Sequence, residues 1–144
     1  MHIADRICQS CMIITVTPDH RSLGQIAWHL VMVLGSMTQI GLDFSGPDGG
    51  ERAPASARTI AEEYRRLAQA LLHAVQTQWT DASLREAKSL FGQDSTNGAA
   101  LRLLAQHEGH HRGQMTVLIR QAGLHPPGVY GPTKEEWIAM GRKP

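Results

Sequence analysis

Residues 101–123, LRLLAQHEGHHRGQMTVLIRQAG, place three of the chain's eight histidines within five residues of one another. Ser95 or Thr96 precedes this stretch as a possible N-cap, and Gly123 is suited to end it in a left-handed C-cap. Two prolines follow at positions 126 and 127, where a helix cannot continue. The sequence therefore predicts one long helix that ends at Ala122.

One face of this helix combines leucines with histidines. His107 and His111 lie four residues apart, so a helix projects both side chains from the same face. Leu104, Gln114 and Leu118 extend that face, which indicates that it points into the protein. Two neutral imidazoles buried side by side need partners, because an unpaired buried polar group costs about 1–3 kcal/mol. A bound metal ion would satisfy both rings at once.

Helical patterns also fill the middle of the chain. Residues 19–40 carry apolar side chains at helical spacing, with Asp19 or Ser22 as the N-cap. Residues 41–57, rich in Gly, Pro, Ser and Asp, are expected to form a surface loop. Thr59 and Glu62 match a capping box, so we expect the next helix to begin at Thr59. Its apolar stripe follows at helical spacing: Ile60, Tyr64, Leu67, Leu71, Val75 and Trp79.

The two ends of the chain complete an all-α prediction. A first helix, short or irregular, is possible from about residue 3 to 15, and Thr133 with Glu136 matches a capping box for a short C-terminal helix. Residues 81–98 are interpreted as a connector, and no strand alternation competes with the helices. We expect one domain, residues 1–144, folded as an antiparallel four-helix bundle.

The composition excludes several classes of function. A formal net charge of +1, no Lys or Arg block longer than two residues, and few aromatic residues argue against nucleic acid as a partner. No apolar run is long enough to cross a bilayer, and the N-terminal residues lack the pattern of a signal peptide. Two cysteines are too few for a disulfide scaffold, so the cytoplasm is the expected location.

Cys8 and Cys11 form a C-x-x-C pattern. A redox pair or half of a zinc site would use this spacing, but the strand–helix context of a thioredoxin motif and a second cysteine pair are both missing. We interpret them as two small apolar residues on one face of a helical turn.

A third metal ligand is sought on another helix. His29 lies between Ile26 and Val33 on the apolar face of the 19–40 helix. A lone histidine at such a place is more often a hydrogen-bonded core residue than a ligand. The inward-facing pair His107 and His111 favours the metal-ligand hypothesis for all three, because helical bundles build metal sites from facing helices.

Glu108 raises a second interpretation, since His107, Glu108 and His111 match the H-E-x-x-H signature of zinc proteases. The longer form of that signature fails, because Gln114 and Val117 stand where it requires Gly and His. A form with a later glutamate would have to use Glu135 or Glu136, beyond a Pro-rich loop. We therefore disfavour proteolysis and expect Glu108 either to face solvent or, like Gln114, to support the site from beside it.

The stretches RSLGQIAWHL (21–30) and LLAQHEGHHRGQMTVLIRQAGLHPPGVYGP (103–132) resemble the DinB/YfiT-like superfamily of metal-binding four-helix bundles. The family pattern is one histidine near the end of the first motif and H-x-x-x-H-R-G-Q in the second, which here selects His29, His107 and His111. The resemblance covers roughly residues 18 to 137.

This resemblance implies an up-down-down-up bundle, a three-histidine site for a divalent metal ion, and frequent homodimers. Some members of the superfamily are thiol-dependent transferases or isomerases that use low-molecular-weight thiols. The family usually has a full-length first helix, whereas only about 17 residues precede residue 18 here. A short first helix could leave apolar surface uncovered, which also favours a homodimer.

The chemistry of the expected site stays open between three alternatives. Zinc or nickel are the first expectations and iron or manganese are possible, since all accept imidazole nitrogen. Three histidines leave coordination positions open, which suits either metal-assisted hydrolysis or thiol S-transfer on an unknown small molecule. The third alternative is a non-catalytic, stress-associated dimer in which the metal ion only links two helices. No residue of the sequence identifies a catalytic group, although Gln114 and Glu108 are candidates to orient one.

Overall fold

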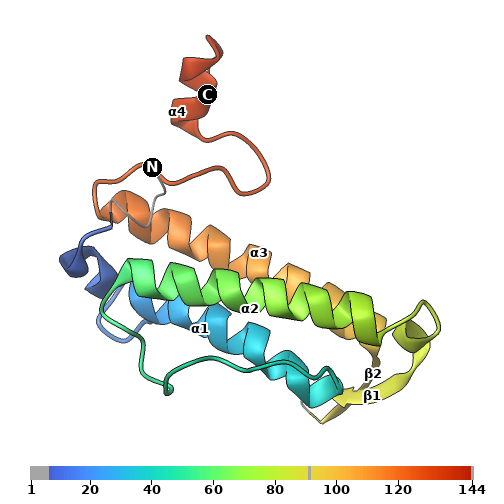
Figure 1. The fold of residues 1–144 in the computed structure, drawn as a ribbon. Coiled ribbons are helices and arrows are strands. Elements are labelled where there is room, and N and C mark those ends of the chain that lie inside the picture. The colour runs from blue at the N-terminus through green and yellow to red at the C-terminus, as the bar shows by residue number, and fades with distance from the viewer. Residues whose placement is uncertain (1–6, 91, 144) are drawn as a thin grey trace.

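Three long helices form the body of the protein in a computed structural model that describes residues 7–90 and 92–143. They are α1 (Leu23–Ser36), α2 (Ala57–Gln78) and α3 (Asn97–Gln121). Figure 1 shows them running alongside one another, and α1 packs against both α2 and α3. The central position of α1 lets it present side chains toward α3.

Helix α1 begins where a capping box fixes its first turn. The Ser22 hydroxyl accepts a hydrogen bond from the Gln25 backbone N–H, and the Gln25 side chain accepts one from the Ser22 N–H. Of the two caps expected, Ser22 is therefore confirmed and Asp19 is not used. The helix continues into a 3-10 turn, η3 (Met37–Ile40), which ends at the left-handed Gly41 (φ 90°).

Helix α2 begins two residues earlier than expected. The Ser56 hydroxyl accepts a hydrogen bond from the Thr59 backbone N–H, so Ser56 is the N-cap and Thr59 already lies in the first turn. The predicted start at Thr59 and its capping box with Glu62 are wrong for this reason. The apolar stripe is confirmed: Ile60, Leu67 and Leu71 are buried, and Tyr64, Val75 and Trp79 are half-buried against the same core.

A small hairpin occupies the segment that was expected to be a connector without strands. Strands β1 (Ala87–Leu90) and β2 (Gln93–Thr96) pair antiparallel, with Ala87 opposite Thr96, after a short 3-10 turn η4 (Ser83–Arg85). The expectation of no strand is wrong because two four-residue strands are too short to show a clear alternation. Asn97, which is fully buried, fixes the hairpin to η4 by donating from Nδ2 to the Ser83 carbonyl at 2.9 Å.

Helix α3 agrees closely with its prediction. The Thr96 hydroxyl accepts a hydrogen bond from the Ala99 N–H and caps its start. The helix ends at Gln121, one residue before the expected Ala122, and Gly123 adopts the left-handed conformation (φ 74°). The whole H-x-x-x-H segment is therefore helical.

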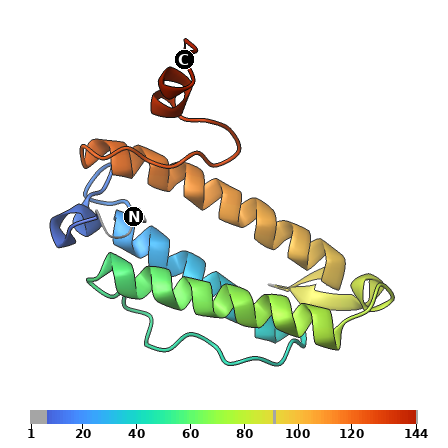
Figure 2. The same cartoon turned by 45° about the horizontal axis from the view of Figure 1, so that its top comes forward.

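The two ends of the described chain differ from the body. Residues 3–6 of the possible first helix lie outside the described residues, and the part from residue 7 forms only a 3-10 turn, η2 (Gln9–Ile13). The capping box of Thr133 and Glu136 is confirmed at the start of α4 (Lys134–Ala139). Figures 1 and 2 both show α4 standing away from the three long helices.

The fold class is therefore mostly helical with one two-stranded sheet, rather than all-α. The described residues contain three long helices, so the up-down-down-up arrangement of four stays a prediction. The main core lies between α1 and α2, with Val31 and Leu67 completely buried. A smaller cluster joins Leu23 and Ile26 to Leu118 and Ile119 of α3. No helix in the described ranges combines the length and apolar character needed to cross a bilayer.

Candidate metal centre

His29 of α1 meets His107 and His111 of α3 at the contact between these helices. One ligand nitrogen from each ring lies within 4.8 Å of the other two. The Nε2 atom of His107 is 3.0 Å from Nε2 of His29 and 3.0 Å from Nε2 of His111. The structure thus brings together the three histidines that the sequence selected, and their role as metal ligands stays a prediction.

Gln114 fixes the orientation of one of these rings. Its Oε1 atom lies 2.7 Å from Nδ1 of His111. An amide oxygen only accepts hydrogen bonds, so Nδ1 carries the proton and donates it. The lone pair of His111 is then on Nε2, which faces His107. A polar partner on the far nitrogen is the usual way in which proteins orient a metal-ligating histidine.

The spacing of the rings fits a shared cation better than a closed hydrogen-bond network. A ring nitrogen carries either one proton or one lone pair, so Nε2 of His107 can make only one good hydrogen bond although two nitrogens lie 3.0 Å away. Two nitrogens bound to one tetrahedral zinc ion lie roughly 3.3 Å apart, given zinc–nitrogen distances of about 2.0–2.1 Å. The two distances from His107 are close to that spacing, and all three nitrogens lie within 4.8 Å of one another.

The surroundings keep the His29 and His107 rings neutral, which is the form that binds metal. Burial, together with the positive charge of Arg21 and the neighbouring His111 and His107, lowers the pKa of His29 to about 4. Burial also lowers the pKa of His107, together with the neighbouring His111 and His110. Neither ring needs to lose a proton at neutral pH before it can donate its lone pair.

Two cavities adjoin His29. A groove of about 720 Å³, here called the His29 groove, runs between residues 9–25 and the loop at residues 51–55, and His29 and Trp28 form part of its wall. A smaller, almost entirely apolar pocket of about 120 Å³ lies between Val33 of α1 and Leu104 of α3, with His29 and His107 in its lining. His29 and His107 therefore border open space, whereas His111 is buried.

Glu108 makes its hydrogen bonds on a different face of α3. Its Oε2 accepts a hydrogen bond from the Tyr64 hydroxyl at 2.6 Å and one from the Arg112 guanidinium at 3.2 Å, and Arg112 also donates to the Tyr64 oxygen at 2.7 Å. Its other oxygen, Oε1, is buried without a hydrogen-bond partner. Glu108 thus links α3 to α2, an arrangement that gives no support to a role as the general base of a zinc protease.

The other histidines and the cysteines lie outside the group. His110, His73 and His125 are exposed, and the His110 ring lies against that of His111 with 4.9 Å between centroids. Cys11 is buried but Cys8 is exposed, so the interpretation of both as apolar residues on one face is wrong for Cys8. Hydrogen bonds from the Cys11 and Ser10 side chains lower the pKa of the Cys8 thiol to about 7.

Two structural features around the site escaped the sequence analysis. The link from Tyr64 to Glu108 and Arg112 joins residues 44 and 48 positions apart, and periodicity cannot pair such side chains. Arg21 lines the His29 groove, yet in the sequence it is simply one cation before a helix. The available signal for Arg21 was its place in the family-like motif RSLGQIAWHL, eight residues before His29.

Comparison with known proteins identifies the family. The model of the DinB family matches residues 16–142. The chain belongs to the DinB family. It is 47% identical over 127 residues to the uncharacterized protein YrdA of Bacillus subtilis strain 168, a match that covers 88% of this chain and 76% of YrdA. The crystal structure of a DinB-like protein from Bacillus cereus ATCC 10987 is 40% identical and superposes with a TM-score of 0.79, covering 88% of this chain and 85% of that one.

These matches confirm the resemblance found in the sequence and the DinB-like fold. They also place the three histidines inside the region that the family model matches. These similarities assign no activity to the chain, so its function has to be argued from the site itself.

Proposed function

We propose that His29, His107 and His111 bind a divalent metal ion, zinc or nickel first, and that the site acts on a small molecule. The observation that carries this proposal is the meeting of three imidazole nitrogens within 4.8 Å beside an open groove of about 720 Å³. A site with a purely structural metal ion would normally be closed to solvent and fully coordinated by protein.

The chain's own residues supply ligands and orientation. Gln114 holds the His111 ring so that Nε2 faces the site. Burial keeps the His29 and His107 rings in the neutral form. The chemistry that a divalent ion supplies when bound to such a set is to lower the pKa of a water or thiol ligand and to act as a Lewis acid.

Thiol S-transfer is the first candidate reaction. The nearest carboxylate on α3, Glu108, is occupied by Tyr64 and Arg112, so it is not free to deprotonate a water molecule for hydrolysis. A thiol loses its proton with less help from a general base, because its ordinary pKa of about 8.5 is far below that of water. In the proposed reaction the thiol proton goes to solvent, the sulfur forms a bond to an electrophilic carbon, and the leaving group departs with its electron pair.

A direct test loads the protein with zinc or nickel and supplies 2-mercaptoethanol with 1-chloro-2,4-dinitrobenzene, from which sulfur displaces chloride. We expect turnover in the wild type and none above background in His111→Ala, while His110→Ala, which removes an exposed neighbouring histidine, behaves as wild type. Hydrolysis of 4-nitrophenyl acetate without thiol would instead favour the hydrolase alternative. Metal binding that raises the melting temperature without either activity would favour a structural ion that links α1 to α3.

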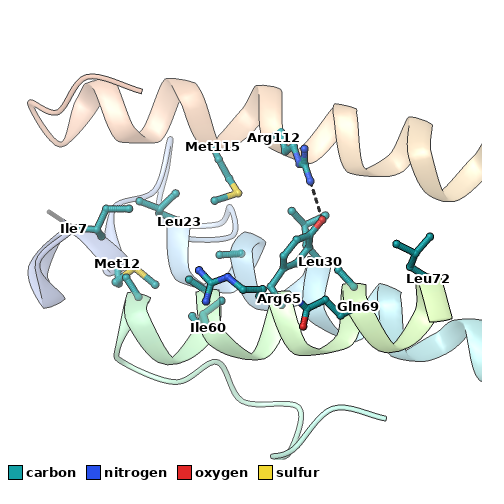
Figure 3. Close-up of a pocket in the computed structure, with 15 residues that line it drawn as sticks. Ile7, Met12, Leu23, Leu30, Ile60, Arg65, Gln69, Leu72, Arg112 and Met115 are labelled. Atoms are coloured by element: carbon teal, nitrogen blue, oxygen red, sulfur yellow. Dashed lines mark hydrogen bonds between the residues drawn. The ribbon is translucent and has the colours of Figure 1, made fainter. Parts of the chain in front are cut away.

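We also propose that the protein is a homodimer. A second groove of about 530 Å³, here called the α2–α3 groove, is lined almost entirely by apolar atoms of α1, α2, α3 and residues 7 and 12. Figure 3 shows Met115 of α3 and Ile60 of α2 on its opposite sides. Leu72, on its border, is 57% exposed. Apolar surface of this kind marks protein contacts, and light scattering after size exclusion should give twice the monomer mass in the wild type and less in Leu72→Glu.

A further inference from the structure

The His29 groove carries charge on its walls as well as access to the histidines. Arg21 lies in one wall, at the start of α1, and Arg52 lies in the other, on the loop before α2. The acidic residue Glu51 also lines the groove, so two guanidinium groups face one carboxylate there. The α2–α3 groove differs, because its lining is nearly all apolar.

Arg21 is the arginine of this groove that lies nearer to His29 along the chain, eight residues before it. It is exposed in the same groove that His29 lines, and within the described residues no carboxylate pairs with it. A guanidinium that lines the same groove as His29, with no carboxylate partner among the described residues, is able to bind an anion there.

From this geometry we infer that the site selects small ligands that carry a carboxylate, and that Arg21 is the residue that recognises it. The inference rests on the proposed function, since it assumes that the ligand's other end reaches a metal ion held by the three histidines. The guanidinium presents two parallel N–H groups, which match the two oxygens of a carboxylate. The ligand therefore lies along the His29 groove, with its anionic end toward the start of α1.

The small apolar pocket sets the size of any remaining substituent. It shares His29 with the groove and is bordered by Val33 and Leu104. Its volume of about 120 Å³ is somewhat smaller than the roughly 150 Å³ of an apolar cavity that holds benzene. A short aliphatic group fits this pocket, and a large aromatic group does not.

Two thiols of equal length test the role of Arg21. The wild-type protein is loaded with cobalt(II), whose visible absorption changes when a ligand enters its coordination shell, and is titrated with 3-mercaptopropionate or with its uncharged amide, 3-mercaptopropionamide. We expect the carboxylate to bind about tenfold more tightly, as for a partly exposed charge-assisted pair. In Arg21→Gln the two thiols should bind equally, with the affinity for the amide and the cobalt stoichiometry both unchanged.

Arg102→Gln is the matched control, because it removes the same charge from an exposed position of α3 that lines none of the three cavities near the histidines. It should retain the preference for the carboxylate. A tenfold preference that survives in Arg21→Gln, or no preference in the wild type, overturns the inference while leaving the metal site intact. No cobalt binding, or no spectral response to either thiol, contradicts the proposed function and this inference together.

Discussion

The hydroxyl group of Tyr64 links α2 to α3 by hydrogen bonds, so its removal should lower the free energy of unfolding. It donates to Glu108 at 2.6 Å and accepts from Arg112 at 2.7 Å. Tyr64→Phe keeps the ring and opens no cavity. The variant leaves Glu108, which is only 8% exposed, with the single 3.2 Å hydrogen bond from Arg112.

The size of the effect follows from these contacts. A hydrogen bond to a charged group contributes about 1.5–3 kcal/mol. The second oxygen of Glu108 already lacks a partner and cannot compensate. We therefore expect Tyr64→Phe to lower the free energy of unfolding by about 2 kcal/mol, and the same change made in a Glu108→Gln background to cost about 1 kcal/mol, as for a neutral hydrogen bond.

Urea denaturation followed by circular dichroism measures both values. Tyr130→Phe is the matched control, because Tyr130 is 87% exposed, and it should change stability by less than about 0.5 kcal/mol. The slope of the unfolding free energy against urea should stay constant, which shows that the folded state alone has changed. A Tyr64→Phe protein within about 0.5 kcal/mol of wild type would refute the reasoning that the buried carboxylate depends on this hydroxyl.

Three further predictions concern other parts of the molecule. Gln114→Ala should weaken metal binding by about 10–100-fold without abolishing it, because it removes the acceptor that orients His111. If the wild type and Gln114→Ala compete equally well with a chelating dye for the metal ion, that role is contradicted. Iodoacetamide should alkylate Cys8 at a rate that rises through about pH 7, because the thiolate is the reactive form and hydrogen bonds lower the pKa of this thiol. Buried Cys11 should stay unmodified, and mass spectrometry with Cys8→Ser as the control shows which cysteine reacts. A midpoint at about pH 8.5 in the wild type would contradict the effect of the contacts to Ser10 and Cys11. Gly35→Ala should destabilise the protein by about 1–3 kcal/mol, because the added Cβ would lie 2.5 Å from Cδ of Pro47. Gly113→Ala, whose Cβ would have nothing within 4 Å, should stabilise α3 by about 0.5–1 kcal/mol. The melting temperatures of the two variants should therefore shift in opposite directions.

The sequence predicted best what depends on local spacing. The inward face of α3 and its left-handed end at Gly123 follow from the 3.6-residue period and from glycine's freedom at positive φ. His29 was found because it lies on the apolar face of its own helix. The meeting of the three rings then required only that α1 pack against α3.

The errors came from competition between neighbouring residues and from contacts between distant ones. Ser56 and Thr59 are both good caps, and the pattern does not show which of them the chain uses. The hairpin of β1 and β2 is stabilised partly by buried Asn97, whose partner Ser83 lies fourteen residues away. The hydrogen bond between Glu108 and Tyr64 could not be predicted for the same reason, because Tyr64 lies far away in the sequence, on a different helix.

The central claim is that the three histidines hold one metal ion per chain. The most direct measurement is elemental analysis of untagged protein, purified without chelator or added metal, for the wild type, His29→Ala and His110→Ala. We predict about one divalent ion per chain in the wild type and in His110→Ala, and none in His29→Ala. Metal that is absent from the wild type, or fully retained in His29→Ala, would contradict the account.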